Sequence, residues 1–301
     1  MEITIPLQLD EEQDSLLDMH SVLNVLNCIN HELLLISELL EHPEEVLGLM
    51  DDIAQAAGRL RNPERAMDLI RGADGLIARI EQTVDGARAR AAEAKRDEIT
   101  LHCENLQAIY AIVRIRVREI MARYRSPDAW VEHRVDELKG NFADYLEAIA
   151  KNSHGSWGAV QNVEEQGESD YLIQIEIDSD HGETLTMPVI FQDVMRDLLS
   201  NARKYTPLGG RIRMRLHATA KELHFTIQDN GMGIPRDSIQ EVVLFGNRAF
   251  NAVDRVTRGG GFGLTKAYYV TRRYRGRMWI DSATREEGGD GTTIEIRIPM
   301  P

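Results

Sequence analysis

Residues 258–270 read RGGGFGLTKAYYV, a glycine cluster that runs straight into an apolar helical pattern. Backbone N–H groups left free at a helix N-terminus, together with the positive end of the helix dipole, form a natural cradle for phosphate. A flexible linker is the alternative, but linkers rarely lead directly into an apolar helix. The stretch therefore predicts a phosphate-binding loop followed by a helix.

Alternating patterns surround this stretch on both sides. Apolar and polar residues alternate in five segments, which is typical of strands with one buried face: YLIQIEI (171–177), RIRMRLHA (211–218), ELHFTIQD (222–229), GRMWIDS (276–282) and TTIEIRIP (292–299). Helical patterns at about 189–205 and 262–273 lie between them. The combination predicts a two-layer α/β sandwich with helices on one face of its sheet.

Three further motifs carry candidate binding residues. DLLSNARKYT (197–206) places Asp197 and Asn201 four residues apart on one helix face, where they can hold Mg²⁺ or its waters. DNGMGI (229–234) follows a strand directly, so Asp229 can accept a hydrogen bond from an exocyclic amine beside glycines that permit a sharp turn. GGDGTTIEI (288–296) precedes the last strand. Singly, each motif is also explained by a solvated helix residue or a plain turn.

In this order, the motifs NARKYT, DNGMGI, GGGFGL and GTTIEI resemble the catalytic and ATP-binding domain of sensor histidine kinases. That Bergerat-type fold belongs to a superfamily that also includes gyrase, MutL-type and chaperone ATPases. The resemblance covers about residues 187–299. The threonine of YTP, the GRMWIDS strand and the short interval between Gly233 and Gly259 favour the kinase branch.

The resemblance implies a role for each matching position, with ATP and Mg²⁺ as cofactors. Asn201, with Asp197, would bind the metal, although the family often has asparagine at the position of Asp197. Asp229 would bind the adenine amino group. One of Arg248, Arg255 and Arg258 would meet the γ-phosphate. The remaining nucleotide-binding positions would be Lys204, Tyr205, Gly231, Gly233, Phe245, Arg258, Gly259, Gly261, Phe262, Gly263, Leu264 and, near the adenine, Thr293.

The first half of the chain is dominated by helix formers, and prolines 43, 63 and 127 break its pattern. Helices are expected at about 12–41, 44–60, 64–124 and 128–152, with a possible interruption at RGADG (71–75). We expect an N-terminal helical hairpin or bundle. The expected regions are a dimerisation and phosphotransfer region at 1–62, additional long helices of a bundle, sensory or docking module at 63–154, and the ATP-binding domain at 155–301.

Two histidines on the first expected helix are candidate phosphate acceptors, because the family carries its acceptor on a dimeric helical hairpin. Neutral imidazole is nucleophilic near neutral pH. Both His20 and His31 are expected on the face opposite the apolar stripe, since eleven residues make about three turns. The family's motif fits His20 better, with Asn24 four residues later, although Ser21 replaces the usual acid; His31 has its acid, Glu32. We favour His20, with His31 or neither as alternatives.

The resemblance implies a two-component-type protein histidine kinase that phosphorylates His20 and passes the group to an aspartate of a separate response regulator. It also implies a homodimer through the N-terminal helices, and Asn24 would suit a phosphatase activity by orienting a water molecule. Two alternatives stay open. One is a serine/threonine kinase of the anti-sigma-factor type, and the other is a phosphotransfer or interaction scaffold with weak autokinase activity.

Composition and charge indicate which partners and which cellular compartment to expect. The chain has 301 residues and a formal net charge of −14, which disfavours nonspecific binding to nucleic acid or to anionic membrane surfaces. No apolar run approaches the ~20 residues of a membrane span, and the first residues lack a secretory pattern. Cys28 and Cys103 have no metal-ligand spacing, so we expect reduced packing residues. We expect a cytoplasmic protein without membrane insertion or a nucleic-acid partner.

Overall fold

The computed structural model describes residues 1–151, 156–252 and 261–301, and it divides the chain into two compact units. The helical unit comprises Leu9–Arg125, and the C-terminal unit comprises Met1–Gln8 together with Ser126–Pro301. The helical unit is thus inserted between a short N-terminal segment and the rest of the C-terminal unit. The boundaries expected at residues 62 and 154 separate regions by expected function and not by compactness, and they stay predictions.

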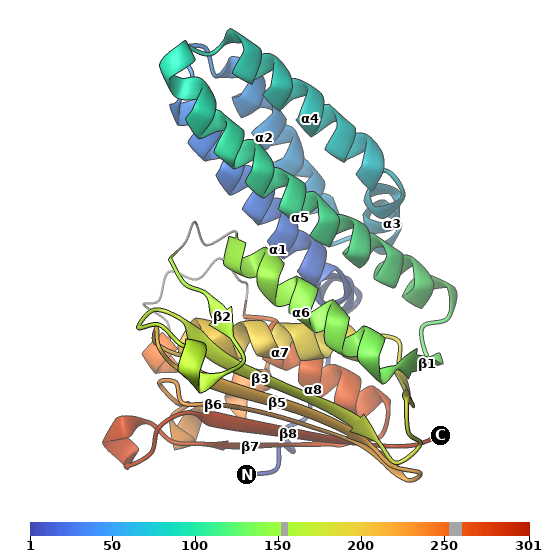
Figure 1. The fold of residues 1–301 in the computed structure, drawn as a ribbon. Helices are drawn as coiled ribbons and strands as arrows, with labels where there is room; N and C mark the ends of the chain where they lie inside the picture. The colour runs from blue at the N-terminus through green and yellow to red at the C-terminus, as the bar shows by residue number, and fades with distance from the viewer. Residues whose placement is uncertain (152–155, 253–260) are drawn as a thin grey trace. The chain divides into compact units, whose positions relative to one another are not determined.

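The helical unit consists of long helices joined by short connections (Figure 1). Asp10 and Gln13 form a capping box at the start of the first helix, and Asn62 caps the third, where Pro63 occupies the first turn. The helices are α1 (Glu11–Glu38), α2 (Glu44–Arg59), α3 (Pro63–Arg71), α4 (Ala73–Arg90) and α5 (Glu93–Arg125).

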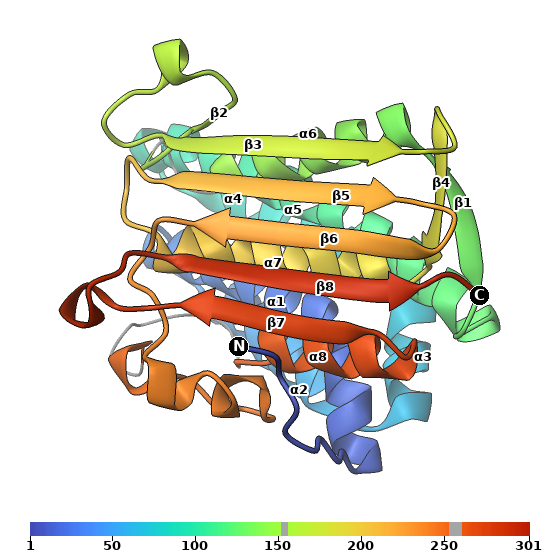
Figure 2. The ribbon, with the colours of Figure 1, turned by 90° about the horizontal axis from the view of Figure 1, so that it is seen from below.

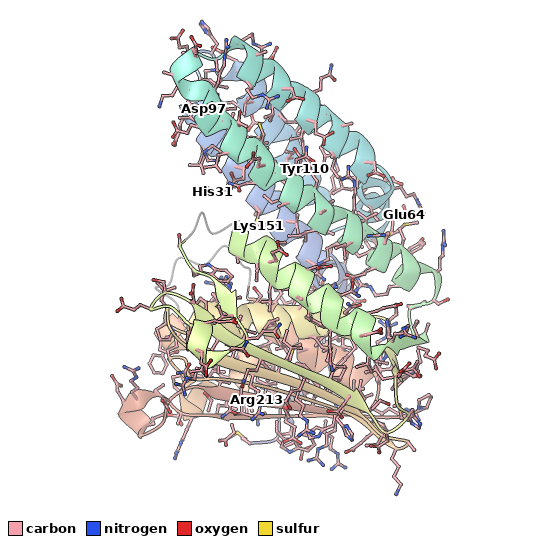
Figure 3. The ribbon with its side chains drawn as sticks, viewed as in Figure 1. His31, Glu64, Asp97, Tyr110, Lys151 and Arg213 are labelled. Atoms are coloured by element: carbon pink, nitrogen blue, oxygen red, sulfur yellow. The ribbon has the colours of Figure 1, made fainter. Side chains whose placement is uncertain are left out.

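The single long pattern expected at 64–124 is corrected to three helices. The interruption anticipated at RGADG is present, because α3 ends at Gly72, and a second break follows where Ala91 adopts an extended conformation. All five helices contribute to one apolar core, so the residues after position 62 pack on α1 and α2. Tyr110 on α5, labelled in Figure 3, is 1% exposed in this core, and burial raises the pKa of its hydroxyl.

The C-terminal unit contains a sheet of six strands among its described residues, in the order β2-β3-β5-β6-β8-β7 (Figure 2). The five expected strands are confirmed as β3 (Tyr171–Ser179), β5 (Arg211–Ala218), β6 (Glu222–Asp229), β7 (Arg277–Ser282) and β8 (Thr292–Pro299), and β2 (Ala159–Val160) extends one edge. The expected helices are confirmed as α7 (Phe191–Tyr205) and α8 (Gly263–Arg273). Short 3₁₀ helices are η1 (Val163–Glu165), η2 (Arg236–Ser238), η3 (Glu241–Val243), η4 (Phe250–Ala252) and η5 (Arg285–Glu287).

The helix expected at 128–152 is corrected at its start. Trp130–Arg134 form strand β1, and the helix α6 covers only Val135–Lys151. β1 pairs antiparallel with β4 (Thr184–Pro188), a partner far along the sequence, so the local helical pattern yields to a distant strand pairing.

One face of the sheet is covered by α6, α7 and α8, whose apolar side chains join those of the strands in a single core (Figure 2). The predicted arrangement of an N-terminal helical part and a two-layer α/β sandwich is therefore confirmed. Successive residues of a strand point to opposite faces, so the alternation in β5, β6 and β8 fixes which residues face the helices.

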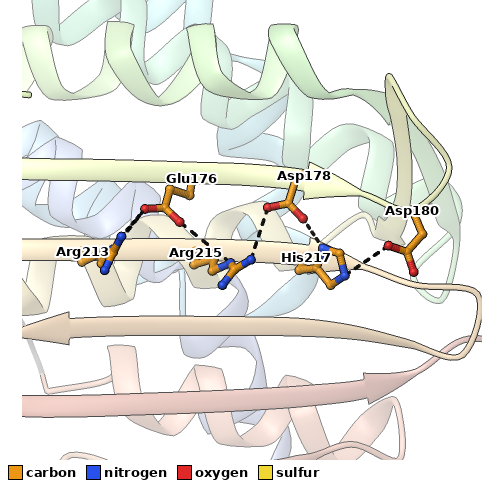
Figure 4. Close-up of polar contacts among 6 residues, drawn as sticks. All are labelled: Glu176, Asp178, Asp180, Arg213, Arg215 and His217. Carbon is orange, nitrogen blue, oxygen red and sulfur yellow. Dashed lines mark hydrogen bonds and ion pairs between the residues drawn. The ribbon is translucent and has the colours of Figure 1, made fainter.

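The other face of the sheet carries charges that pair across β3 and β5 (Figure 4). Arg213 Nη2 lies 2.6 Å from Glu176 Oε1, Arg215 Nη2 lies 3.8 Å from Asp178 Oδ2, and His217 contacts Asp178. Exposed ion pairs contribute only about 0 to 1 kcal/mol each. The apolar face under the helices is therefore the main source of stability for this sheet.

The N-terminal segment adds backbone pairing to the edge strand β7. The amide of Ile3 donates to the carbonyl of Met278 at 2.8 Å, and the amide of Ile280 donates to the carbonyl of Met1 at 2.9 Å. The hydroxyl of Tyr268 on α8 donates to the carbonyl of Ile5. Residues 1–8 thus belong structurally to the sandwich, although their sequence position adjoins α1.

Candidate functional site

Helix α7 supplies a line of polar residues at spacing four: Asp193, Asp197, Asn201 and Tyr205. This spacing places them along one side of the helix. Asn201 lies against the first residue of α8, because a Cβ added to Gly263 would stand 2.7 Å from Asn201 Nδ2. The predicted metal-binding amide and the predicted phosphate-binding helix start are therefore brought together.

The turn after β6 packs against the end of α7. The carbonyl of Tyr205 accepts a hydrogen bond from the amide of Met232 at 3.1 Å, and a Cβ on Gly231 would stand 2.6 Å from that same carbonyl. Gly233 has a φ of +71°, and a Cβ there would meet the Ala283 carbonyl at 2.2 Å. The DNGMGI motif thus needs both glycines for its turn and its close backbone contacts.

Asp229 lies at the end of β6, with its carboxylate held in this turn. Its Oδ1 accepts a hydrogen bond from the amide of Gly231 at 2.8 Å. Burial raises the pKa of Asp229 to about 6, although backbone N–H groups of Gly231 and Thr292 favour the ionised form. At neutral pH the carboxylate is therefore mostly ionised, and it takes up a proton as the pH falls through about 6.

The threonine beside Asp229 is Thr292, whereas Thr293 is the threonine expected near the adenine. Asp229 pairs with Thr292 in the β6–β8 register, and Thr293 pairs with Gln228 on the opposite face of the sheet. Thr292 Oγ1 lies 2.8 Å from Ser282 Oγ, which in turn accepts a hydrogen bond from the amide of Ile234. The alternation of β8 carries this signal, because Thr292 is in phase with the buried Ile294, Ile296 and Ile298.

Cationic side chains gather near the glycine loop. Burial lowers the pKa of Lys204 first of all, and the nearby Arg248 and Arg203 lower it further. A Cβ on Gly261, where φ is +79°, would stand 3.5 Å from Arg248 Nε. Such convergence of cations favours an anionic ligand. The predicted residues Arg255, Arg258 and Gly259 lie outside the described residues.

Two aromatic rings from the segment between β6 and α8 lie against each other. The rings of Phe245 and Phe262 have centroids 4.6 Å apart, and both side chains are half-buried. Leu264, in the first turn of α8, packs against the core of the sandwich. These three predicted positions therefore lie at the start of α8, together with Gly261 and Gly263.

The sequence reasoning missed Lys266, which is 1% exposed and lies between the two aspartates of α7. Its ammonium donates to Asp193 Oδ2 and lies 3.4 Å from Asp197 Oδ2. Asp197, expected as a metal ligand, is 8% exposed and faces this ammonium. The available signal was a lysine within the otherwise apolar series Gly263, Ala267 and Val270.

The candidate phosphate acceptor lies in the helical unit. His20 Nε2 is 3.0 Å from Asn24 Nδ2, which agrees with the spacing of the acceptor motif. His20 is 5% exposed, so its expected position on an exposed face is wrong for this structure. The reason is that α1 packs against three helices, α2, α3 and α5, so side chains outside its apolar stripe are buried as well. His31, labelled in Figure 3, is half-buried.

The described part of the chain contains neither a clustered metal site nor a membrane-spanning helix. No group of three histidine, cysteine, aspartate or glutamate side chains there has the arrangement of a metal site. No helix in those same ranges combines the length and the apolar character that a membrane crossing requires.

Residues 186–301 match the family of histidine kinase-, DNA gyrase B- and HSP90-like ATPases, so the chain carries a domain of this family. The resemblance drawn from the four motifs is thereby confirmed. Among similar proteins are sensor kinases. The adaptive-response sensory kinase SasA of Synechococcus elongatus is 27% identical over 203 residues, which cover 65% of this chain and 49% of that protein.

Two further relatives match shorter stretches. SasA of Trichormus variabilis is 38% identical over 96 residues, covering 32% of this chain and 23% of that protein. The sensor histidine kinase WalK of Bacillus subtilis is 32% identical over 108 residues, covering 35% and 17%. The chain therefore spans half or less of each relative's length. The solved mycobacterial sensor histidine kinase MprB aligns with a TM-score of 0.40 at 22% identity, covering 56% of this chain and 97% of that one.

Proposed function

We propose that the chain is an ATP-dependent protein histidine kinase that transfers the γ-phosphoryl group of ATP to His20. The observation that carries the nucleotide part is the pairing of two features on α7. The Asn201 amide lies against Gly263 at the start of α8, and Tyr205, one turn later at the end of α7, contacts the turn of Asp229. The candidate metal ligand Asn201, the start of α8 and the half-buried Asp229 are thus all held by the last turns of α7.

These residues fit an adenine nucleotide with Mg²⁺. The ionised carboxylate of Asp229 would accept a hydrogen bond from the adenine amino group, and the side chain of Asn201 would hold the metal. The backbone N–H groups at Gly261 to Leu264 would contact the phosphates, with Lys204 and Arg248 adding positive charge. When bound, MgATP supplies the phosphoryl group, and the metal neutralises charge on its oxygens.

The contact with Asn24 favours one tautomer of His20. An amide NH₂ can only donate, so this hydrogen bond requires the tautomer in which Nε2 accepts and Nδ1 carries the proton. Attack by Nε2 would form the N–P bond as the bond from the γ-phosphorus to its bridging oxygen breaks and ADP leaves, and Nδ1 would release its proton to water. Because His20 is buried and uses its lone pair, α1 would have to expose it first.

The later steps of the proposal rest on the similarity to sensor histidine kinases. The phosphoryl group would pass from His20 to an aspartate of a separate response regulator, in a homodimer formed through the helical unit. Asn24 would orient water in a phosphatase reaction on that regulator.

A labelling experiment tests the proposal. The purified chain is incubated with γ-labelled ATP and Mg²⁺, alongside His20→Gln and the matched variant His31→Gln on the same helix. We expect acid-labile, base-stable label in the wild type and in His31→Gln, and its loss in His20→Gln. Label that survives His20→Gln would refute His20 as acceptor, and acid-stable label on an added protein would instead indicate a serine/threonine kinase.

A further inference from the structure

A buried charge cluster lies directly beneath the site, formed by Asp193, Asp197 and Lys266. The three side chains are 4%, 8% and 1% exposed. Two carboxylates and one ammonium leave the cluster with a net charge of −1. Charges withdrawn from water this far cost several kcal/mol each unless partners compensate them. A cluster with such a cost, next to a site for a highly charged ligand, calls for a role beyond packing.

The compensation is uneven between the two carboxylates. Lys266 Nζ makes a hydrogen-bonded ion pair with Asp193 Oδ2, whereas Asp197 Oδ2 lies 3.4 Å away and accepts no hydrogen bond within the described ranges. Asp197 is one helical turn from Asn201, and its charge acts on Lys204. The less compensated carboxylate is therefore the one nearer to the phosphate-binding end of the site.

Lys266 also belongs to the first turn of α8, which carries the glycine loop. Its amide donates to the carbonyl of Phe262 at 2.8 Å. The neighbouring Thr265, 0% exposed, donates from Oγ1 to the carbonyl of Leu244 at 3.1 Å. The start of α8 is thus anchored to α7 through Lys266, and through Thr265 to the residue preceding Phe245.

We infer that Lys266 is a positioning residue whose ammonium offsets the charge of Asp197 and fixes the start of α8, so that the site accepts a polyphosphate next to a buried carboxylate. The inference rests on the proposed nucleotide binding. Without Lys266, the uncompensated charge on α7 repels the phosphates but leaves the adenine end unaffected. The effect should therefore grow with the number of phosphates on the ligand, which a general loss of structure does not explain.

Calorimetric affinities for adenosine, ADP and ATP, measured in EDTA and again in Mg²⁺, test this inference. The variants are Lys266→Met, Asp197→Asn, the neutral triple variant Asp193→Asn/Asp197→Asn/Lys266→Met, and Lys221→Met as an exposed control. In EDTA we expect Lys266→Met to lower the affinity for ATP relative to adenosine by about fivefold or more. Asp197→Asn should raise this ratio, and the triple variant should restore at least the wild-type value.

The outcomes separate the inference from the function on which it rests. If wild-type protein binds no ATP, the proposed function fails and the inference fails with it. If wild type and Lys221→Met bind ATP but the ratio is unchanged in Lys266→Met and Asp197→Asn, the inference alone is overturned. If Lys266→Met does not fold, the other two variants still test the inference. An affinity for ATP relative to adenosine that is not raised in Asp197→Asn, or that stays below the wild-type value in the triple variant, overturns it.

Discussion

At the scale of single residues, Asp229 makes the affinity for the adenine group depend on pH. Burial raises its pKa to about 6, and only the ionised carboxylate accepts fully from an amine. Affinity for adenosine, which has no phosphates to titrate, should be constant above about pH 7 and fall as pH drops below about 6. Calorimetry across this range checks it, with Asp229→Asn expected to bind weakly and without this pH dependence. A flat wild-type profile would contradict the assignment.

The same group has a defined effect on stability. The pKa of Asp229 is higher in the folded protein than in the unfolded chain, so folding favours its protonated form. Its contribution to the free energy of unfolding is therefore fully present below the ordinary carboxyl pKa of about 4 and is lost as pH rises through about 6. The ionised carboxylate of Asp229 therefore lowers the stability of the folded protein at neutral pH, while it provides a hydrogen-bond acceptor in the site.

Gly263 tests the contact between α7 and α8. A Cβ at this position would stand 2.7 Å from Asn201 Nδ2, so Gly263→Ala should displace the amide and lower the affinity for MgATP by ~10-fold or more. Gly140→Ala in α6 is the matched control, because no atom lies within 4 Å of its added Cβ. Equal affinities in the two variants would argue against Asn201 as a metal-binding residue.

At the residue level, the position of a candidate residue in the fold could be predicted where a local sequence pattern sets the geometry, and not where packing between elements sets it. Asn201, Gly231, Gly263 and Asp229 are recognisable from their motifs. Lys266 is not, because its two partners come from another helix. The inward position of Thr292 could have been predicted from the alternation of β8, since Thr292 is in phase with the buried isoleucines of that strand.

At the scale of elements, the N-terminal segment closes the edge of β7, and Ile3 anchors it. Ile3 is 2% exposed within the core of the sandwich. Ile3→Ala should lower the free energy of unfolding of the C-terminal unit by about 2 to 4 kcal/mol. Denaturant unfolding measures this, with Val163→Ala, at a side chain 60% exposed, as control. If Ile3→Ala lowers the free energy of unfolding no more than Val163→Ala does, the segment does not stabilise the sheet.

Elements with strong periodicity were predictable, and those made by distant pairing were not. The alternation of apolar and polar residues in β5, β6 and β8 predicted both that they are strands and which of their residues are buried. β1 lies in a stretch of helical pattern and becomes a strand because β4 pairs with it. The break at Ala91 between α4 and α5 has neither proline nor glycine at the turn, so nothing local announced it.

At the scale of the whole molecule, the chain joins two compact units by two connections, after Gln8 and before Ser126. The sandwich and the helical region were both foreseen from the change of periodicity along the chain. The return of residues 1–8 to the sandwich was not, since a segment so short carries no periodic signal. The helices after position 62 share one core with α1 and α2, so we expect the helical unit to unfold as one unit.

The central claim is that the sandwich binds MgATP between Asp229 and Asn201, and calorimetry with MgATP tests it most directly. We expect wild-type protein to bind with a stoichiometry near one nucleotide per chain, and Asp229→Asn and Asn201→Ala each to weaken binding by about tenfold or more. Binding that both variants leave unchanged, or no binding by the wild type, would contradict the account.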